Sequence, residues 1–140
     1  DPARLAIVAE NAARLGASSI TIDPPPENQQ FDRVLLDAPC SNTGVMRRRV
    51  ELRWRIRPEE ITRLAAVQLQ ILQAAAKRTC PGGVLVYSTC SLEREENQQV
   101  VTRFFASNRD FHLDQEKELT PMSDGVDGAY CARLIRSPST

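Results

Sequence analysis

One octapeptide sets the architecture of this chain, and it reads Val34-Leu35-Leu36-Asp37-Ala38-Pro39-Cys40-Ser41. Its first residues form a short apolar run without helical spacing, which predicts a buried strand. Proline has a fixed φ and no backbone N–H, so the strand has to end at Pro39, and the polar residues that follow are typical of a turn. The octapeptide therefore predicts a strand whose carboxyl end carries a carboxylate and a thiol. Ligands bind at such ends in open parallel sheets.

The composition is that of one folded domain. The chain has 140 residues, of which 41% are hydrophobic and 26% are charged, and its formal net charge is zero. A chain of this size has room for one sizeable core. All but two of its 18 basic residues are arginines. Arginine suits bidentate phosphate contacts, although a GC-rich genome would produce the same bias. No apolar run approaches the length of a membrane span, so we expect no membrane partner.

The four cysteines, Cys40, Cys80, Cys90 and Cys131, include no Cys-x-x-Cys pair. This spacing argues against a metal site, and the large apolar content argues against a disulfide framework. We therefore expect reduced thiols and a cytoplasmic protein. Cys80 and Cys131 are predicted to be packing residues, and His112, the only histidine, is predicted to lie on the surface or at a strand edge.

Helical and strand-like segments alternate along the chain. Apolar spacing predicts helices over residues 2–15, 58–79 and 93–106, and strands over residues 19–22, 31–37, 84–87, 111–113 and 129–135. Asp1 is expected to cap the first helix. That helix is expected to bury one face, formed by Leu5, Ile7, Val8, Ala12 and Leu15. Strands that alternate with helices predict an α/β fold with parallel pairing.

Two thiols are predicted to meet at one edge of the sheet. Cys40 follows the strand that ends at Asp37, and Cys90 follows the next strand along the chain, which ends near Ser88. If these strands are parallel neighbours, about 4.8 Å apart, their carboxyl ends lie side by side. A thiolate is a strong nucleophile, and the N-terminus of the helix expected from residue 93 would stabilise one at Cys90. The pair predicts a nucleophile with an acid or base, or a redox pair; the alternative is two small buried hydrophobic residues.

Four segments carry a family resemblance. They are residues 37–45, which include Asp37-Ala38-Pro39-Cys40-Ser41, residues 87–92, which include Ser88-Thr89-Cys90-Ser91 and precede Glu95-Glu96-Asn97, the closing strand at 127–134, and the helix at 10–16. The first two resemble motifs IV and VI of the Sun/Fmu family of RNA cytosine-C5 methyltransferases. The resemblance implies a Rossmann-like methyltransferase fold, with a mostly parallel sheet and an antiparallel last strand.

The resemblance also implies a covalent mechanism with S-adenosylmethionine as cofactor. Cys90 would add to C6 of a cytosine, and Cys40 would help to remove the C5 proton and to release the product. Asp37 would contact the methionine moiety of the cofactor or polarise the cytosine ring, and Asp23 stands where the family has an acid near the adenine. In the DNA counterparts the thiol of a Pro-Cys motif is the nucleophile, so the assignment of that role to Cys90 rests on the resemblance.

The segment from Arg47 to Arg57 predicts an RNA contact. It holds six arginines and only one acid, Glu51, together with an aromatic side chain. A basic loop with an aromatic residue suits an RNA backbone and an unstacked base. The alternative is a solvated loop with its tryptophan packed on the domain. The residues predicted to bind RNA are Arg47, Arg48, Arg49, Arg53, Trp54 and Arg55.

The chain has no counterpart of the family's Gly-rich cofactor turn or of its upstream RNA-recognition region. We therefore expect residues 1–140 to be the C-terminal part of one methyltransferase catalytic domain, N-terminally incomplete and inactive alone. Ribosomal RNA is the expected substrate, with transfer RNA as the second choice, and no metal is expected. Two alternatives remain: a non-catalytic RNA-binding or assembly module on the same fold, and a thiol redox or acyl-transfer enzyme.

Overall fold

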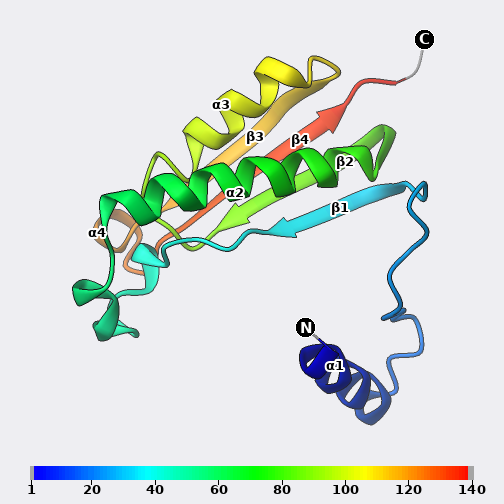
Figure 1. Ribbon diagram of the computed structural model, residues 1–140, viewed down its shortest axis with the longest axis horizontal. Helices are drawn as coiled ribbons and strands as arrows, with labels where there is room; N and C mark the ends of the chain where they lie inside the picture. Colours follow the sequence, from blue (N-terminus) through cyan, green and yellow to red (C-terminus); the bar gives the residue numbers. More distant parts are fainter. Residues whose placement is uncertain (1, 139–140) are drawn as a thin grey trace.

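The computed structural model describes residues 2–138, so the predicted Asp1 cap lies outside the described residues. Helices and strands alternate as expected (Figure 1). The helices are α1 (Pro2–Leu15), α2 (Pro58–Lys77), α3 (Gln98–Ser107) and the short α4 (Pro121–Asp124). The strands are β1 (Phe31–Asp37), β2 (Thr79–Thr89), β3 (Phe111–Leu119) and β4 (Ala129–Arg136). Two short 3₁₀ segments, Thr43–Val45 and Val50–Trp54, lie between β1 and α2.

The strands form one sheet with the order β1-β2-β4-β3. β1 is parallel to β2, whereas β4 is antiparallel to both β2 and β3. Three strands therefore share one direction and the last strand opposes them, which confirms the predicted α/β class and its antiparallel last strand. Asp37 pairs with Ser88, so β1 and β2 end together at one edge of the sheet.

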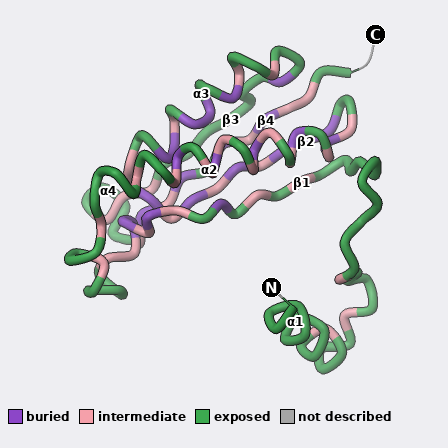
Figure 2. Tube along the Cα trace, in the orientation of Figure 1, coloured by how far each residue is buried: buried purple, intermediate pink, exposed green. Residues whose placement is uncertain are grey.

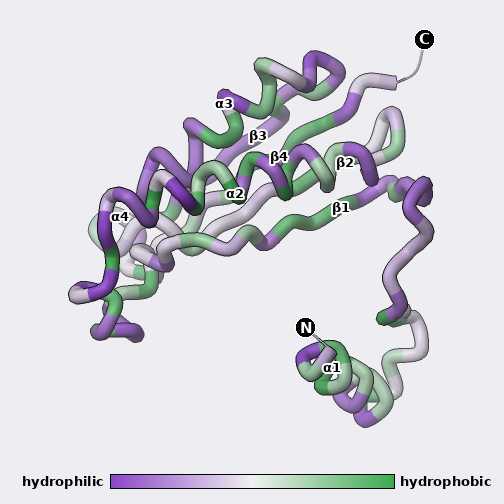
Figure 3. Tube along the Cα trace, in the orientation of Figure 1, coloured by the Kyte–Doolittle hydropathy of each residue, from purple (hydrophilic) through white to green (hydrophobic). Residues whose placement is uncertain are grey.

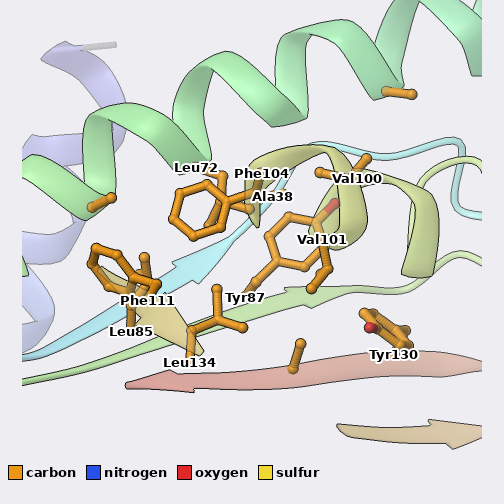
Figure 4. Close-up of a cluster of buried hydrophobic side chains, with 13 residues drawn as sticks. Ala38, Leu72, Leu85, Tyr87, Val100, Val101, Phe104, Phe111, Tyr130 and Leu134 are labelled. Carbon is orange, nitrogen blue, oxygen red and sulfur yellow. The ribbon is translucent and has the colours of Figure 1, made fainter. Parts of the chain in front are cut away.

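The core lies between the sheet and the two helices α2 and α3, which cover the same face (Figure 1). Leu72 from α2, Phe104 from α3 and Leu85 from β2 are each fully buried there (Figure 4). Burial of a side chain of this size stabilises the fold by about 1.5–3 kcal/mol. Phe104 also packs edge-on against Phe111, with ring centroids 5.4 Å apart. These contacts fix β2 beneath α3 and so fix the edge where β2 ends.

Helix α1 buries no residue, so the prediction of a buried face on this helix is wrong. Four of the five predicted residues, Leu5, Ile7, Val8 and Leu15, are between 44% and 68% exposed. Figure 3 shows the apolar stripe on α1, and Figure 2 shows that the helix is largely exposed and lies apart from the sheet. Helical spacing thus predicted the helix correctly, but no layer of residues 2–138 covers its apolar side.

One predicted strand is absent, and β2 and β3 extend well beyond their predicted bounds. Residues 19–22 form turn and irregular structure instead of a strand, because no described strand lies beside them to pair with. β2 begins at Thr79 rather than at residue 84, and Cys80–Gly83 bulges out where Phe31 pairs with Thr79 but Arg33 pairs with Val84. β3 continues to Leu119 as an edge strand, where charged residues on both faces leave no apolar alternation to detect.

Helix α3 begins at Gln98, five residues later than predicted. Residues 94–97 form a turn, in which Gln99 N–H donates to the Arg94 carbonyl at 3.0 Å. The side chains of Glu96 and Asn97 point into the protein and are fully buried. α4 lies within the segment predicted as loop. No helix among residues 2–138 combines the length and apolar character needed to cross a membrane.

Candidate active site

The structure brings Cys40 and Cys90 together. Their Sγ atoms lie 3.4 Å apart, although the residues are 50 positions apart in the sequence. The cause is the pairing of β1 with β2, which extends one step past the strands, where Ala38 N–H donates to the Ser88 carbonyl at 2.9 Å. The segment that follows each strand then turns away from the sheet, and the two segments bring their thiols to the same point. The convergence predicted from the topology is therefore present.

The thiol pair has an unequal electrostatic balance. The hydrogen bond from Cys40 lowers the pKa of Cys90 to about 7, with help from the positive charge of Arg49 and against burial and the negative charge of Asp37. The same hydrogen bond with Cys90, and burial in second place, raise the pKa of Cys40 far above its usual range. Cys90 is therefore the thiol that ionises near neutral pH, and Cys40 is the partner that keeps its proton and donates it. This asymmetry favours Cys90 as the nucleophile.

Asn42 completes the contacts of the two thiols. Its Nδ2 donates to the Cys40 carbonyl at 2.8 Å, and its Oδ1 lies 3.0 Å from Cys90 Sγ, where it accepts a hydrogen bond from the protonated thiol. Its backbone is left-handed, with φ 61° and ψ 25°, a conformation that asparagine tolerates better than most residues. The turn residue thus holds both cysteines, a role that no sequence pattern indicated.

The helix terminus predicted to stabilise Cys90 is not beside it, because α3 begins eight residues later, at Gln98. A backbone dipole at the helix end acts only over its first turn. The Cys40 thiol, the backbone N–H of Cys90 itself and Arg49 take its place as the groups that stabilise the thiolate and lower the Cys90 pKa. The predicted ionisation of Cys90 thus has a different physical cause.

A pocket of about 540 Å³ opens beside the two thiols. Its walls are formed by the end of β1, the turn after it, one arginine of α1 and the tip of β2; the lining residues are Arg4, Asp37, Ala38, Pro39, Cys40, Asn42, Arg49 and Cys90. Asp37 is exposed, and its carboxylate accepts a long hydrogen bond from the Ser88 hydroxyl at 3.4 Å. A carboxylate, two thiols and two guanidinium groups therefore share one pocket at the carboxyl ends of two parallel strands.

The predicted RNA-binding residues fall into three groups. Arg49 lines the thiol pocket, and Arg55 lines a second pocket, of about 430 Å³, that Cys40 also lines. Arg47 and Arg48 both pair with the carboxylate of Asp127, the latter at 2.6 Å. Arg53 is exposed, and Trp54 is 85% exposed, so this tryptophan is not packed on the domain. Their contact with RNA stays a prediction.

Asp23 does not share this pocket. It lies in the loop before β1 and lines a separate pocket with Pro24–Pro26 and Phe31, the first residue of β1. Cys40 instead follows the last residue of β1, and Cys90 follows the last residue of β2. Its contact with the adenine of a cofactor therefore stays a prediction. No three His, Cys, Asp or Glu side chains among the described residues are grouped to hold a metal ion.

The remaining single residues are away from the thiols. His112 is exposed on the edge strand β3, as predicted. Cys131 is exposed and Cys80 is half-buried, so the prediction that Cys131 packs inside the fold is wrong. Cys131 lies on β4, whose side chains alternate between the covered and the uncovered face of the sheet. A short apolar strand does not reveal which face a helix will cover.

Two parallel strand ends that carry two thiols and a carboxylate, on an α/β sheet with an opposed last strand, define a protein of the methyltransferase-fold class. The chain belongs to the 16S rRNA methyltransferase RsmB/F family, whose sequence model matches residues 1–135. It is 40% identical to the ribosomal RNA small subunit methyltransferase B of Erwinia tasmaniensis over 97% of the chain, and 42% identical to that of Proteus mirabilis over 96%. It covers 35% and 33% of those proteins, about a third of the length of the curated relatives that it matches.

Solved structures share the fold. NSun6 from Pyrococcus horikoshii, solved with SFG, superimposes with a TM-score of 0.82 and 28% identity over 99% of this chain and 40% of its own. A methyltransferase homologue from the same organism gives a TM-score of 0.81 and 26% identity over 97% of this chain and 51% of its own. The family resemblance seen in the two cysteine motifs is thus confirmed over residues 1–135.

Proposed function

We propose that this chain is the thiol-bearing part of an S-adenosylmethionine-dependent RNA cytosine-C5 methyltransferase that acts on ribosomal RNA. The observation that carries the proposal is the contact of 3.4 Å between Cys40 and Cys90 in a pocket that also holds Asp37. Family membership and the names of the relatives support the reaction and the substrate. The covered fraction of those relatives, and the exposed apolar residues of α1, support a role as one part of a longer catalytic domain.

The pocket residues fit the methionine end of the cofactor. Asp37 presents an exposed carboxylate at the end of β1, where it complements an ammonium group. The related NSun6 was solved with SFG, an analogue of S-adenosylmethionine, which supports this assignment. The cofactor supplies the methyl group that cytosine receives. Asp23 is the further residue that we assign to it, at the adenine end.

The first step needs a nucleophile because C5 of cytosine is inert while the ring is aromatic. The Cys90 thiolate gives an electron pair to C6, and the C5–C6 π electrons move to C5. C5 would then take the methyl group of the cofactor, whose sulfonium sulfur would keep the electron pair of the broken sulfur–methyl bond and leave as a neutral thioether. The low pKa of Cys90, about 7, makes the thiolate available at neutral pH. Asp37 lines the same pocket, and polarisation of the cytosine ring is the alternative role for its carboxylate.

The second step needs a base. Once Cys90 has become a thioether it carries no charge and is only a weak hydrogen-bond acceptor, so the main cause of the raised Cys40 pKa is largely removed. Cys40 then loses its proton to solvent, and its thiolate takes the proton from C5. The C–H electron pair restores the C5–C6 double bond and expels Cys90 as a thiolate. The thiol contact thus supports these two roles, with Cys90 acting first and Cys40 second.

The RNA is proposed to lie along the arginine segment. Arg49 and Arg55 line the two pockets that share Cys40, and the exposed Trp54 offers a stacking surface. Arg47, Arg48 and Arg53 add positive charge around this path. The net charge of zero means that the attraction for RNA is local to this side of the molecule.

The test is a methylation assay with a cytosine-containing ribosomal RNA fragment in the complete protein that contains this chain. Cys90→Ala should abolish both methyl transfer and adduct formation, because no nucleophile is left. Cys40→Ala should accumulate a protein–RNA adduct that resists denaturant and shifts on a gel, because the C5 proton is not removed. The reverse pattern would exchange the two roles. If the unsubstituted complete protein binds RNA but shows neither methylation nor an adduct, the non-catalytic RNA-binding module is favoured.

The thiol contact also admits a redox pair as a second candidate function. Such an enzyme would cycle between a dithiol and a Cys40–Cys90 disulfide while reducing a protein disulfide. Reduction of insulin by the chain with dithiothreitol as the reductant would support it. A turnover rate no greater than that of the Cys40→Ala variant would exclude it.

A further inference from the structure

Glu96 is a fully buried carboxylate that the proposed mechanism does not use. It lies in the turn before α3, beneath the two thiol-bearing turns. Burial of a carboxylate without partners is costly. Four hydrogen bonds offset this cost, and all of them are donated by residues next to the site or by the helix α2 that covers it.

The two carboxylate oxygens of Glu96 bind both thiol-bearing turns. Oε1 accepts the Ser41 N–H at 2.9 Å and Gln68 Nε2 at 3.0 Å. Oε2 accepts the hydroxyls of Ser41 and Ser91, each at 2.5 Å. Ser41 directly follows Cys40, and Ser91 directly follows Cys90. One side chain thus holds the residue next to each thiol.

Glu96 is itself fixed in place. Its carbonyl accepts the Tyr87 hydroxyl at 2.6 Å. The neighbouring Asn97 accepts a hydrogen bond from the Thr89 hydroxyl at 2.6 Å and donates to the Ser91 carbonyl at 2.9 Å. Gln68 also donates to the Pro39 carbonyl at 2.8 Å, so the turn that carries Cys40 is tied to α2 as well. These contacts make the carboxylate a fixed point between the two turns.

We propose that Glu96 is a positioning residue that sets the separation of the Cys40 and Cys90 thiols. A carboxylate oxygen only accepts hydrogen bonds, so both serine hydroxyls have to point at it and the two turns are drawn together. The residue touches neither sulfur and acts through the two serines. In the proposed methyltransferase the two cysteines act in turn on one cytosine. The effect of their separation on methylation therefore rests on the proposed function.

The separation of the thiols is measurable without RNA or cofactor. Diamide accepts two electrons and two protons from a thiol pair and leaves an intramolecular disulfide, and the rate of closure reports how often the two sulfurs meet. The experiment follows Cys40–Cys90 disulfide formation in the 140-residue chain by peptide mass spectrometry. Urea unfolding of each variant shows that it is folded.

Three variants of Glu96 and one control separate the possibilities. Glu96→Ala removes the acceptor, and Glu96→Asp keeps the charge but shortens its reach by one methylene. Glu96→Gln keeps the length of the side chain. Its amide NH2 can donate to the Ser41 and Ser91 hydroxyl oxygens once both hydroxyls rotate to accept instead of donate. Glu95→Ala is the matched control, because Glu95 is the adjacent carboxylate and is exposed.

The expected result is a disulfide rate about 100-fold lower in Glu96→Ala and about 10-fold lower in Glu96→Asp, the loss that a displacement of about 1 Å brings at a reacting pair. Glu96→Gln should stay within about threefold of the parent, because its hydrogen bonds can re-form, and Glu95→Ala should not differ. If Glu96→Ala does not fold, the comparison of Glu96→Asp with Glu96→Gln decides. A folded Glu96→Asp variant that closes the disulfide at the parent rate would overturn the proposal.

A second measurement uses the complete protein. Glu96→Asp should lower kcat for methyl transfer about 10-fold or more with KM for S-adenosylmethionine unchanged, because the thiols and not the cofactor contacts are displaced. A normal disulfide rate in Glu96→Asp refutes the positioning role whatever the enzyme does. If Glu96→Asp lowers the disulfide rate but the unsubstituted complete protein has no methyltransferase activity, the positioning role stands and only the proposed function is refuted.

Discussion

Gly44 and Gly128 lie backbone against backbone, with the Gly128 N–H donating to the Gly44 carbonyl at 2.8 Å. Gly44 in turn donates to the Cys90 carbonyl at 3.0 Å. The turn that follows Cys40, the tip of β2 and the start of β4 therefore meet at these two glycines. Asp127, beside Gly128, adds its ion pairs with Arg47 and Arg48 to the same junction.

Gly44→Ala should destabilise the fold and displace the thiols. A Cβ at this position would overlap the Gly128 carbonyl and lie 2.8 Å from the Cys90 carbonyl oxygen. We expect a loss of about 3 kcal/mol in the free energy of unfolding, the upper end of the usual cost of overpacking, measured by urea titration. Gly125→Ala is the control, because a Cβ there meets nothing within 4 Å and strains only its backbone at φ 68°. Equal disulfide rates in the two variants would contradict this role of Gly44.

Cys40→Ala should raise the pKa of Cys90. The Cys40 thiol stabilises the Cys90 thiolate by donating to it, so its removal favours the protonated form. In the parent chain the rate of Cys90 alkylation by iodoacetamide should rise with pH around a midpoint near 7. In the variant the midpoint should move up toward the ordinary thiol value of about 8.5. Peptide mass spectrometry follows Cys90 alone, and an unchanged midpoint would show that Arg49 or another group supplies the stabilisation.

Arg49→Ala should weaken RNA binding and reduce its dependence on salt. Arg49 is the arginine of the predicted segment that lines the thiol pocket, so a backbone phosphate of the bound strand is its expected partner. Loss of one phosphate contact lowers the slope of log affinity against log salt by about one. Fluorescence anisotropy with a single-stranded RNA, in the complete protein, measures this slope. Arg103→Ala, on the exposed side of α3, should leave it unchanged.

Leu72→Ala should cost about 2–5 kcal/mol of unfolding free energy, because a fully buried side chain leaves a cavity between α2 and the sheet. Leu15→Ala, a substitution of the same chemistry at a position that is 68% exposed in α1, should change it by no more than about 0.5 kcal/mol. The two midpoints of urea unfolding give the comparison. A similar cost at both positions would mean that α1 packs on the domain in solution.

The segments predicted correctly are those whose pattern is set locally. β1 has the predicted bounds, and α2 begins at Pro58 as expected, because apolar runs, prolines and first-turn acids act within a few residues. The edge strand β3 and the bulge of Cys80–Gly83 were not predicted in full, since pairing rather than local pattern creates them. The strand expected at 19–22 fails for the same reason.

The sequence alone establishes that two thiols and one carboxylate lie at the ends of strands, because the residues that form the strand, end it and form the turn follow one another directly in the chain. The role of Cys40, the thiol of the octapeptide Val34–Ser41, depends on the folded chain. The parallel pairing of β1 with β2 brings the two thiol-bearing turns to one edge of the sheet, where Cys40 and Cys90 lie 3.4 Å apart. The hydrogen bond across that distance lowers the pKa of one thiol and raises that of the other. Glu96, an acid in a polar turn by sequence, becomes a buried link between both turns only once the chain is folded, since its partners come from three separate segments.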